Sequence, residues 1–516
     1  MVRSSKRIAA LVLIGLLSLH AAVFLMRESR KDSLSDLRQC QAENISRVKQ
    51  QKTEIEDVLY DYEHYRSPFT EEDLKNLLDQ EEKGRRRVLA GEIRLSRESM
   101  REDLILLFDL LREHYAAYEY FGGEEHFSLA KERLLESIEE SEEAWTLLSF
   151  EEAIRSELSF VRDLHFKIGM KPMIPSQDEI FFYSNAQIEY FKDKKGFCHL
   201  ENQSRRYVLE VETAEGKPMP IEALMKPSLN LKGEIIYRPG LLSPLADHYQ
   251  ISLKFRDEKG TYTVDLFKAA GSGSDFGKEV VLEREIEGIP ILSIRSMHIQ
   301  KREDVAKVAK FATRQRKMPV SVLDLRGNAG GISLLPCVWF RSYTGELPST
   351  GRQAALLLNR SYILLSSKRK EANSVAGKSF SEMRPSLQPS PGALADMETA
   401  GIQNGWHVEA YEEKIYPNSN KIFVLVDKET ASAAEWFVHD LIRIENLFLV
   451  GTNTAGAQRT GGGISFRLPR TNQQVVIPSV LYLPDTVQEG EGYHPDLWMN
   501  EKDGIERLIR FVKSRE

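Results

Sequence analysis

The sequence predicts a mixed α and β protein with an α/β core, a helical N-terminal region and a β-rich insert. Apolar residues repeat at helical spacing up to about residue 165, and short alternating runs between turn residues fill 171–285. Strand and helix patterns then alternate from Ile289 onward, which indicates parallel strands. At 516 residues the chain is too long for one ordinary core. We therefore expect five segments: 1–30, 31–98, 99–170, 171–285 and 286–516.

Composition and charge exclude several classes of protein. Hydrophobic residues at 41% and charged residues at 28% are globular values. The net charge of -7 leaves no basic footprint, so no nucleic-acid partner is expected. The three cysteines, Cys40, Cys198 and Cys337, are far apart and form no CxxC pair. We expect no metal and no cofactor.

Residues 1–30 have the pattern of a membrane anchor or signal. A basic start, MVRSSKR, precedes a nearly continuous apolar run from Ile8 to Met26. A helix that spans a bilayer needs about 20 residues, whereas a cleaved signal has a shorter apolar region. We expect residues 8–26 to anchor an extracytoplasmic body in the membrane. If the chain is cleaved after the His20-Ala21-Ala22 stretch, the protein would be secreted or periplasmic.

The next two segments are predicted to be helical. Residues 31–98 are polar with sparse apolar positions, which is typical of a solvated helical linker; a coiled stalk over 31–90 that forms an oligomer is the alternative. Within 99–170, Leu104, Leu107 and Leu111 mark one apolar helix face. A further helix pattern ends near His165.

The core segment, 286–516, contains an insertion and two chemically suggestive turns. Residues 366–415 are polar and rich in Ser and Pro, as in an exposed loop or lid. Asp324 and Arg326 can pair to fix the turn in DLRGNAGG, whose glycines expose N–H groups able to hold an anion. Ser432 lies where a strand and tight turn lead into a helix, and alone it would be read as a helix cap.

These motifs together resemble the S41 serine peptidases, which include the tail-specific or C-terminal processing proteases and the tricorn core protease. DLRGNAGG and ETASAAEWF carry the resemblance, and it extends over residues 100–515 in family order. Two further elements match, Asp163-Leu164-His165-Phe166 and Glu489-Gly490-Glu491-Gly492-Tyr493-His494-Pro495-Asp496. The resemblance implies a ClpP/crotonase-like α/β core and a serine-type peptidase that acts on a protein or peptide substrate.

The resemblance also implies a set of site residues. Ser432 would be the nucleophile, and the N–H of Ala433 would be one oxyanion donor. Gly330 or Gly331 would supply the other. Tail-specific members use a lysine where this chain has Ala457, so a Ser-Lys dyad is not expected.

Tricorn-like members instead use a histidine and a glutamate, and His165 and Glu489 stand at the matching places. His165 would take the serine proton, and Glu489 would orient its ring. Without the resemblance, His165 would be read as a buried histidine bonded to backbone. Lys428 is expected to be solvated, and Glu435 to favour the start of the helix by its charge.

A non-enzymatic function is the alternative hypothesis. The retinoid-carrying proteins of the eye resemble the same fold and bind apolar ligands without proteolysis. The missing lysine at Ala457 favours such a module, which would bind an apolar ligand or a peptide. The presence of Ser, His and Glu candidates together argues for the enzyme.

Overall fold

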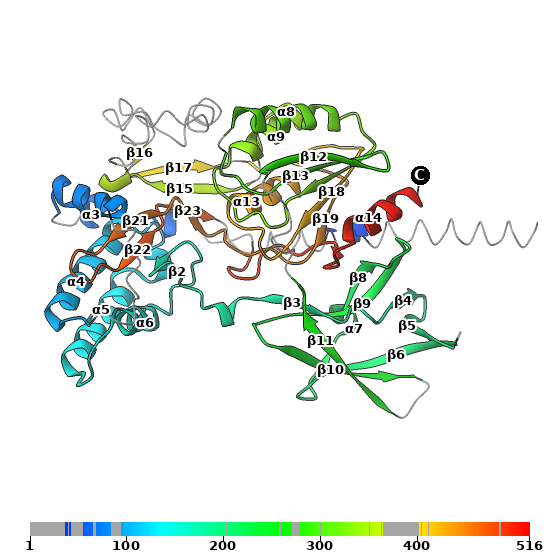
Figure 1. Cartoon of the computed structure of the whole chain (residues 1–516), viewed down its shortest axis with the longest axis horizontal. Coiled ribbons are helices and arrows are strands. Elements are labelled where there is room, and N and C mark those ends of the chain that lie inside the picture. Colours follow the sequence, from blue (N-terminus) through cyan, green and yellow to red (C-terminus); the bar gives the residue numbers. More distant parts are fainter. Residues whose placement is uncertain are drawn as a thin grey trace, which may run out of the picture.

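The computed structural model describes residues 37–39, 41–42, 55–65, 69–83, 94–202, 204–256, 260–270, 279–299, 301–349, 351–362, 364, 402–403, 405–410, 412–483 and 487–515. It contains a helical subdomain, a β-rich insert and a layered α/β core, which confirms the predicted mixed fold (Figure 1).

The core is a six-stranded sheet covered by helices on both faces. Strand β12 is antiparallel to β13, and the remaining neighbours pair in parallel. In sheet order the strands are β12 (Val281–Ile286), β13 (Ile289–Ile294), β14 (Val320–Asp324), β18 (Lys421–Val426), β19 (Leu447–Gly451) and β24 (Leu497–Trp498). One face packs against α8 (Arg302–Gln315), α9 (Leu334–Thr344) and α13 (Ala433–Leu441), and the other against α14 (Gly504–Lys513). Because both faces are covered, β13 and β14 are buried throughout their length.

The insert is a nine-stranded antiparallel sheet, at the lower right in Figure 1. Strand β10 pairs with both β11 and β6, so the sheet curls back on itself around its own apolar core. Its elements are β3 (Phe181–Ser184), β4 (Tyr190–Asp193), β5 (Gly196–Glu201), β6 (Ser204–Thr213), β7 (Pro218–Met219), α7 (Ile221–Leu224), β8 (Met225–Leu229), β9 (Ile235–Ser243), β10 (His248–Phe255) and β11 (Thr261–Lys268).

The helical subdomain lies at the left in Figure 1 and contains α2 (Tyr62–Tyr65), α3 (Glu71–Lys83), α4 (Arg97–His114), α5 (Gly123–Glu140) and α6 (Leu147–Glu157). Short 3-10 turns cover Ile55–Asp57, Glu119–Phe121 and Ser176–Asp178. The predicted apolar face of α4 is confirmed, since Leu104, Leu107 and Leu111 are fully buried.

Two smaller sheets join these helices to the C-terminal part of the chain. One has the order β2-β1-β22-β21, with β1 (Lys167–Ile168), β2 (Lys171–Pro172), β21 (Ile464–Arg467) and β22 (Gln474–Ile477). The other has the order β16-β17-β15-β23-β20, with β15 (Gln353–Leu357), β16 (Ile402–Gln403), β17 (Trp406–Ala410), β20 (Thr460–Gly461) and β23 (Val480–Leu483). Because β1 pairs with β22, the segment after His165 lies beside residues far along the chain.

The structure differs from two of the boundary predictions. The described residues 55–65 and 69–78 are not a solvated linker: Ile55 and Leu74 are fully buried, and the Trp406 Nε1–H donates to the Tyr60 carbonyl at 2.8 Å. Their sparse apolar positions form a docking face against the body. Within the predicted loop 366–415, β16 and β17 add to β15 as strands, and residues 365–401 lie outside the described part.

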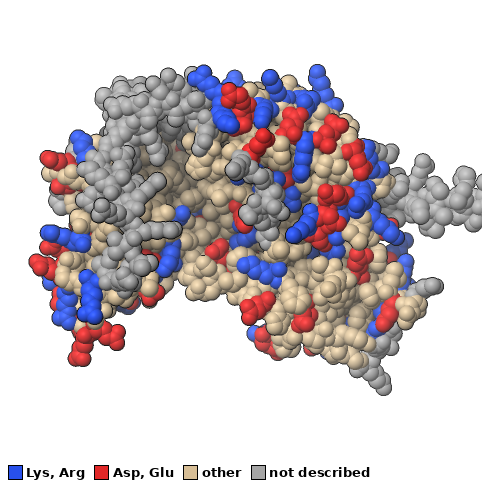
Figure 2. Space-filling model, in the orientation of Figure 1, with Lys and Arg blue, Asp and Glu red and all other residues tan. Residues whose placement is uncertain are grey.

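The prediction of a membrane-spanning helix is wrong for the described part of the chain, where no helix has the length and apolar character needed to cross a bilayer. Residues 8–26, on which that prediction was placed, lie outside the described residues. An extracytoplasmic location, an oligomer through 31–90 and the lack of a nucleic-acid partner stay predictions. On the face drawn in Figure 2, basic and acidic side chains are interspersed over the core.

Candidate active site

The turn between β18 and α13 holds Ser432 in an unusual backbone conformation. Its φ of 53° and ψ of -122° place a non-glycine residue at positive φ. Such a conformation costs about 1–3 kcal/mol and persists only where the surroundings enforce it. Backbone outliers of this kind cluster at functional sites, so the strain itself indicates a functional role for Ser432.

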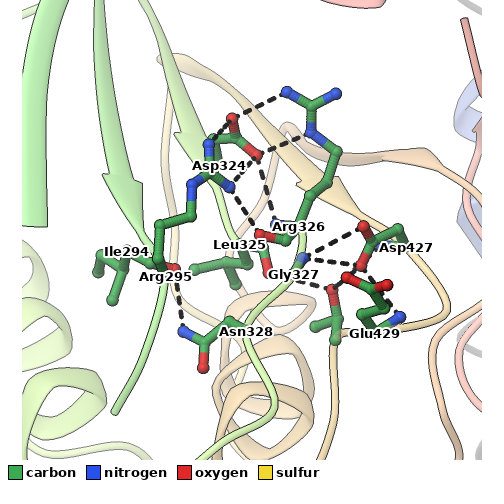
Figure 3. Close-up of polar contacts among 10 residues, drawn as sticks. Ile294, Arg295, Asp324, Leu325, Arg326, Gly327, Asn328, Asp427 and Glu429 are labelled. Carbon is green, nitrogen blue, oxygen red and sulfur yellow. Dashed lines mark hydrogen bonds and ion pairs between the residues drawn. The ribbon is translucent and has the colours of Figure 1, made fainter. Parts of the chain in front are cut away.

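Buried charge fixes the neighbouring turn in DLRGNAGG. The Arg326 Nε–H donates to Asp324 Oδ1 at 2.9 Å, which confirms the predicted pair. Arg295, which no sequence motif indicates, also contacts this turn: its Nη1 donates to Asp324 Oδ1 at 3.0 Å and to the Arg326 carbonyl at 2.7 Å (Figure 3). Burial alone would raise the pKa of Asp324, but the two guanidinium groups outweigh it and hold that pKa at about 2.

Two polar residues tie this turn to the one that carries Ser432. Asp427 accepts the Gly327 N–H at 3.0 Å (Figure 3). It also accepts the Thr430 hydroxyl at 3.1 Å. The Asn328 carbonyl accepts the Ala431 N–H at 3.0 Å. The two turns therefore form one braced unit at the carboxyl ends of β14 and β18.

The two candidate oxyanion glycines differ in how their N–H groups are used. The Gly330 N–H donates to Asn328 Oδ1 at 3.0 Å, so it is already engaged, and this favours Gly331. Both need to be glycine, with φ of 94° and 137°. A Cβ on Gly330 would lie 2.7 Å from the Ser432 Cβ, which shows how closely this turn approaches the serine.

Glu435 has a larger role than the predicted charge at a helix start. It is fully buried, and its Oε2 accepts the Ser432 N–H at 3.2 Å and the Ala457 N–H at 2.7 Å. Its Oε1 accepts the Thr454 hydroxyl at 2.5 Å and the Gly456 N–H at 2.7 Å. Burial raises the pKa of Glu435, and these donors oppose the rise. The carboxylate thus joins the nucleophile turn to the segment 454–457.

The structure places His165 beside Ser432. The imidazole Nε2 lies 2.9 Å from Ser432 Oγ, although the residues are 267 positions apart. Burial lowers the pKa of His165, while Asp163 raises it and Lys167 lowers it further. The other ring nitrogen, Nδ1, is buried and makes no hydrogen bond within the described residues.

Asp163 holds the histidine turn, a role that the sequence analysis did not assign. Its Oδ1 accepts the backbone N–H of His165 at 2.7 Å and of Phe166 at 3.1 Å, which is an Asx turn. The Tyr115 hydroxyl donates to Oδ2 at 2.7 Å, and the Thr460 hydroxyl donates to Oδ1 at 2.8 Å. The signal was present in the sequence, since aspartate two residues before a histidine favours this turn.

Glu489 is near His165 but contacts backbone instead of the ring. Its carboxylate accepts the N–H groups of Leu164 at 3.1 Å, Gln458 at 3.2 Å and Arg459 at 3.1 Å. The predicted direct contact that would orient the imidazole is therefore replaced by support of the histidine turn. Burial raises the pKa of Glu489 to about 8, with Arg459 opposing the rise and Asp163 adding to it.

Asp163, His165 and Glu489 are also a group that could hold a metal ion, since one possible ligand atom of each lies within 4.8 Å of the others. The carboxylate oxygens of Asp163 and Glu489 already accept hydrogen bonds from backbone N–H groups and a hydroxyl. A cation would have to compete with these bonds, and we assign no metal to the group.

A family comparison matches residues 345–497 to the model described as Peptidase family S41, a span that includes Ser432 and Glu489. The predicted S41 resemblance is confirmed, and the match supports peptidase function with a protein or peptide substrate. The match does not reach His165, and it does not identify which residues are catalytic.

Similar solved structures include mature CPAF complexed with lactacystin, at 15% identity and a TM-score of 0.41 over 81% of this chain and 98% of that one. The photosystem II D1 C-terminal processing protease has 12% identity and a TM-score of 0.34 over 81% and 98%. A lipoprotein from Streptococcus agalactiae has 12% identity and a TM-score of 0.33 over 82% and 100%. Likenesses at this level support no statement about function. A comparison with curated protein sequences gives no match.

Proposed function

We propose that this S41 chain is a serine-type peptidase in which Ser432 is the nucleophile and His165 the general base. The observation that carries the proposal is the 2.9 Å separation between His165 Nε2 and Ser432 Oγ. As Oγ attacks the peptide carbonyl carbon, Nε2 takes the hydroxyl proton and later gives it to the leaving amine. Water then cleaves the acyl-enzyme by the same two proton transfers.

The surrounding groups match the charges that develop in this reaction. Asp163 favours the imidazolium form of His165, since it raises the pKa of that ring. The N–H groups of Ala433 and Gly331 would receive the oxyanion at the start of α13, where the helix dipole is also favourable. Glu489 contributes by fixing the backbone at Leu164.

The direct test replaces Ser432 by Ala and His165 by Ala. Peptide hydrolysis should fall by about 10⁴-fold or more in each variant. The nucleophile and its base act as a unit, so the loss of either one removes most of the catalysis. A fluorophosphonate probe should label Ser432 in the wild type and should label neither variant. Circular dichroism would show that both variants fold.

Because burial lowers the pKa of His165, the acid limb of kcat/KM should lie below the ordinary histidine value of 6.5. Full hydrolysis by the Ser432→Ala variant would end the proposal. A folded wild type that neither cleaves peptides nor reacts with the probe would favour the non-catalytic binding module.

A further inference from the structure

Lys428 lies in the turn just before Ser432, and the reaction described above does not use it. The residue is not solvated as predicted. Its ammonium donates to the carbonyls of Gly490 at 2.7 Å, Ala455 at 3.1 Å and Thr454 at 3.3 Å. A charged lysine has three donors, so these contacts account for all of them. The ring of Phe181 lies 5.3 Å from the ammonium and covers it further.

The three carbonyls belong to the two segments on which the rest of the site depends. Thr454 and Ala455 begin a segment, 454–459, whose amides bind the carboxylates of Glu435 and Glu489. Gly490 directly follows Glu489. Lys428 therefore sits where the nucleophile turn, the segment 454–459 and the Glu489 segment meet.

We propose that Lys428 is a positioning residue: its ammonium holds the segment 454–459 and the Glu489 segment against the nucleophile turn, and so sets the separation of His165 from Ser432. The proposal rests on the peptidase function above. Lys428 is not a substitute base, because its described bonds go to carbonyl oxygens, whereas the Ser432 hydroxyl faces His165.

The charge of Lys428 makes the role testable. Burial lowers its pKa to about 8, while the carboxylates of Glu179, Glu435 and Glu491 raise it and Lys268 lowers it. Above this pH the neutral amine keeps two donors and turns a lone pair toward the third carbonyl. The hydrogen bonds of Lys428 to these carbonyls should then weaken, and kcat should fall at alkaline pH.

Through Lys428, stability should change with pH in the opposite direction to kcat. A fall in kcat at alkaline pH can therefore be told apart from unfolding. The folded pKa is below the unfolded value of 10.5, so between about pH 8 and 10.5 the unfolded chain binds more protons at this lysine. Through this group, stability rises with pH in that window. Activity should therefore decline while the protein stays folded.

The experiment compares wild type, Lys428→Met and Lys428→Arg across pH 6 to 10. Met removes the charge at similar length. In this variant kcat should fall about 10²-fold, which is the loss typical of a catalytic group displaced by about 1 Å. KM should change much less. The variant's alkaline limb near pH 8 should disappear. Arg retains the charge at all these pH values and should restore most of kcat without that limb. Lys254→Met is the control, since among the described residues that ammonium pairs with Glu210 and Glu212 in the insert, and it should behave as wild type.

A second readout does not require activity. In the Ser432→Ala background, hydrogen exchange at the amides of Gly456, Ala457, Gln458 and Arg459 should speed up at least tenfold when Lys428 becomes Met. Unchanged exchange together with an unchanged kcat and pH profile would overturn the role of Lys428. If the wild type shows neither hydrolysis nor labelling, the peptidase proposal fails, and the exchange experiment still decides whether Lys428 holds these segments.

Discussion

The nucleophile turn and the histidine turn meet at one point but are held in different ways. Ser432 continues directly from β18 into α13, and Asp427 and Glu435 brace its turn. His165 follows α6 on a segment that Asp163 fixes through Thr460, 297 positions away. Ser432 therefore lies between a core strand and a core helix, whereas His165 depends on the contacts that Asp163 makes with Tyr115 and Thr460. We infer that the histidine turn is the more easily disturbed half of the site.

Among the variants that compare the two turns, the largest effect should come from Asp163→Ala. The variant frees the N–H groups of His165 and Phe166 and removes the acceptor of the Tyr115 hydroxyl. A base displaced by about 1 Å costs about 10²-fold in rate, so kcat/KM should fall by at least that factor. Asp178→Ala is the control, because the side chain of Asp178 pairs with the partly exposed Arg162 in the described part of the chain.

The companion variant Asp163→Asn keeps an acceptor for the turn but loses the charge that raises the pKa of His165. Its acid limb in kcat/KM should move to lower pH than that of the wild type. Wild-type kinetics in Asp163→Ala would show that the histidine turn is held by other contacts, and the contrast between the two turns would fail.

An intermediate effect, on the free energy of unfolding at acid pH, should come from Asp324, which lies in the turn braced against the turn of Ser432. The folded pKa of Asp324 is about 2 against 3.8 when unfolded, so its ionised form stabilises the fold above about pH 4. This contribution, about 2 kcal/mol, should be lost as pH falls from about 4 toward 2. Urea unfolding of wild type and Asp324→Asn should give a difference that shrinks over this window. A difference independent of pH would contradict the ionic brace.

The smallest effect is expected for Tyr115→Phe, which removes one of the hydrogen bonds to Asp163. One such bond contributes about 1 kcal/mol, so the midpoint of urea unfolding should fall slightly. The Asx turn itself stays intact, and kcat/KM should change by less than about fivefold. A loss as large as that of Asp163→Ala would mean that the hydroxyl, and not the turn, positions His165.

Sequence periodicity was sufficient for the core. The alternating strand and helix patterns from Ile289 onward correctly predict the α/β core, because burial imposes those patterns. Periodicity failed for the described residues 55–65 and 69–78. Their apolar positions are few, and only the tertiary structure shows that Ile55 and Leu74 meet a partner surface.

The candidate site was also predictable only in part, because many of its contacts form only in the tertiary structure. The S41 resemblance pointed to Ser432 and His165 as a pair, and a motif could not give their separation. The contacts of Lys428, Arg295 and Glu489 depend on segments that meet only after folding. Local spacing therefore carries no information about them, and the predicted ring contact of Glu489 was replaced by backbone contacts.

The order of the site residues along the chain has a consequence for biosynthesis. A ribosome delivers His165 first, Ser432 267 residues later and the Glu489 segment last of the three. The β1 strand after His165 also waits for its partner, β22. A nascent chain therefore cannot bring the proposed site together before the Glu489 segment has been made.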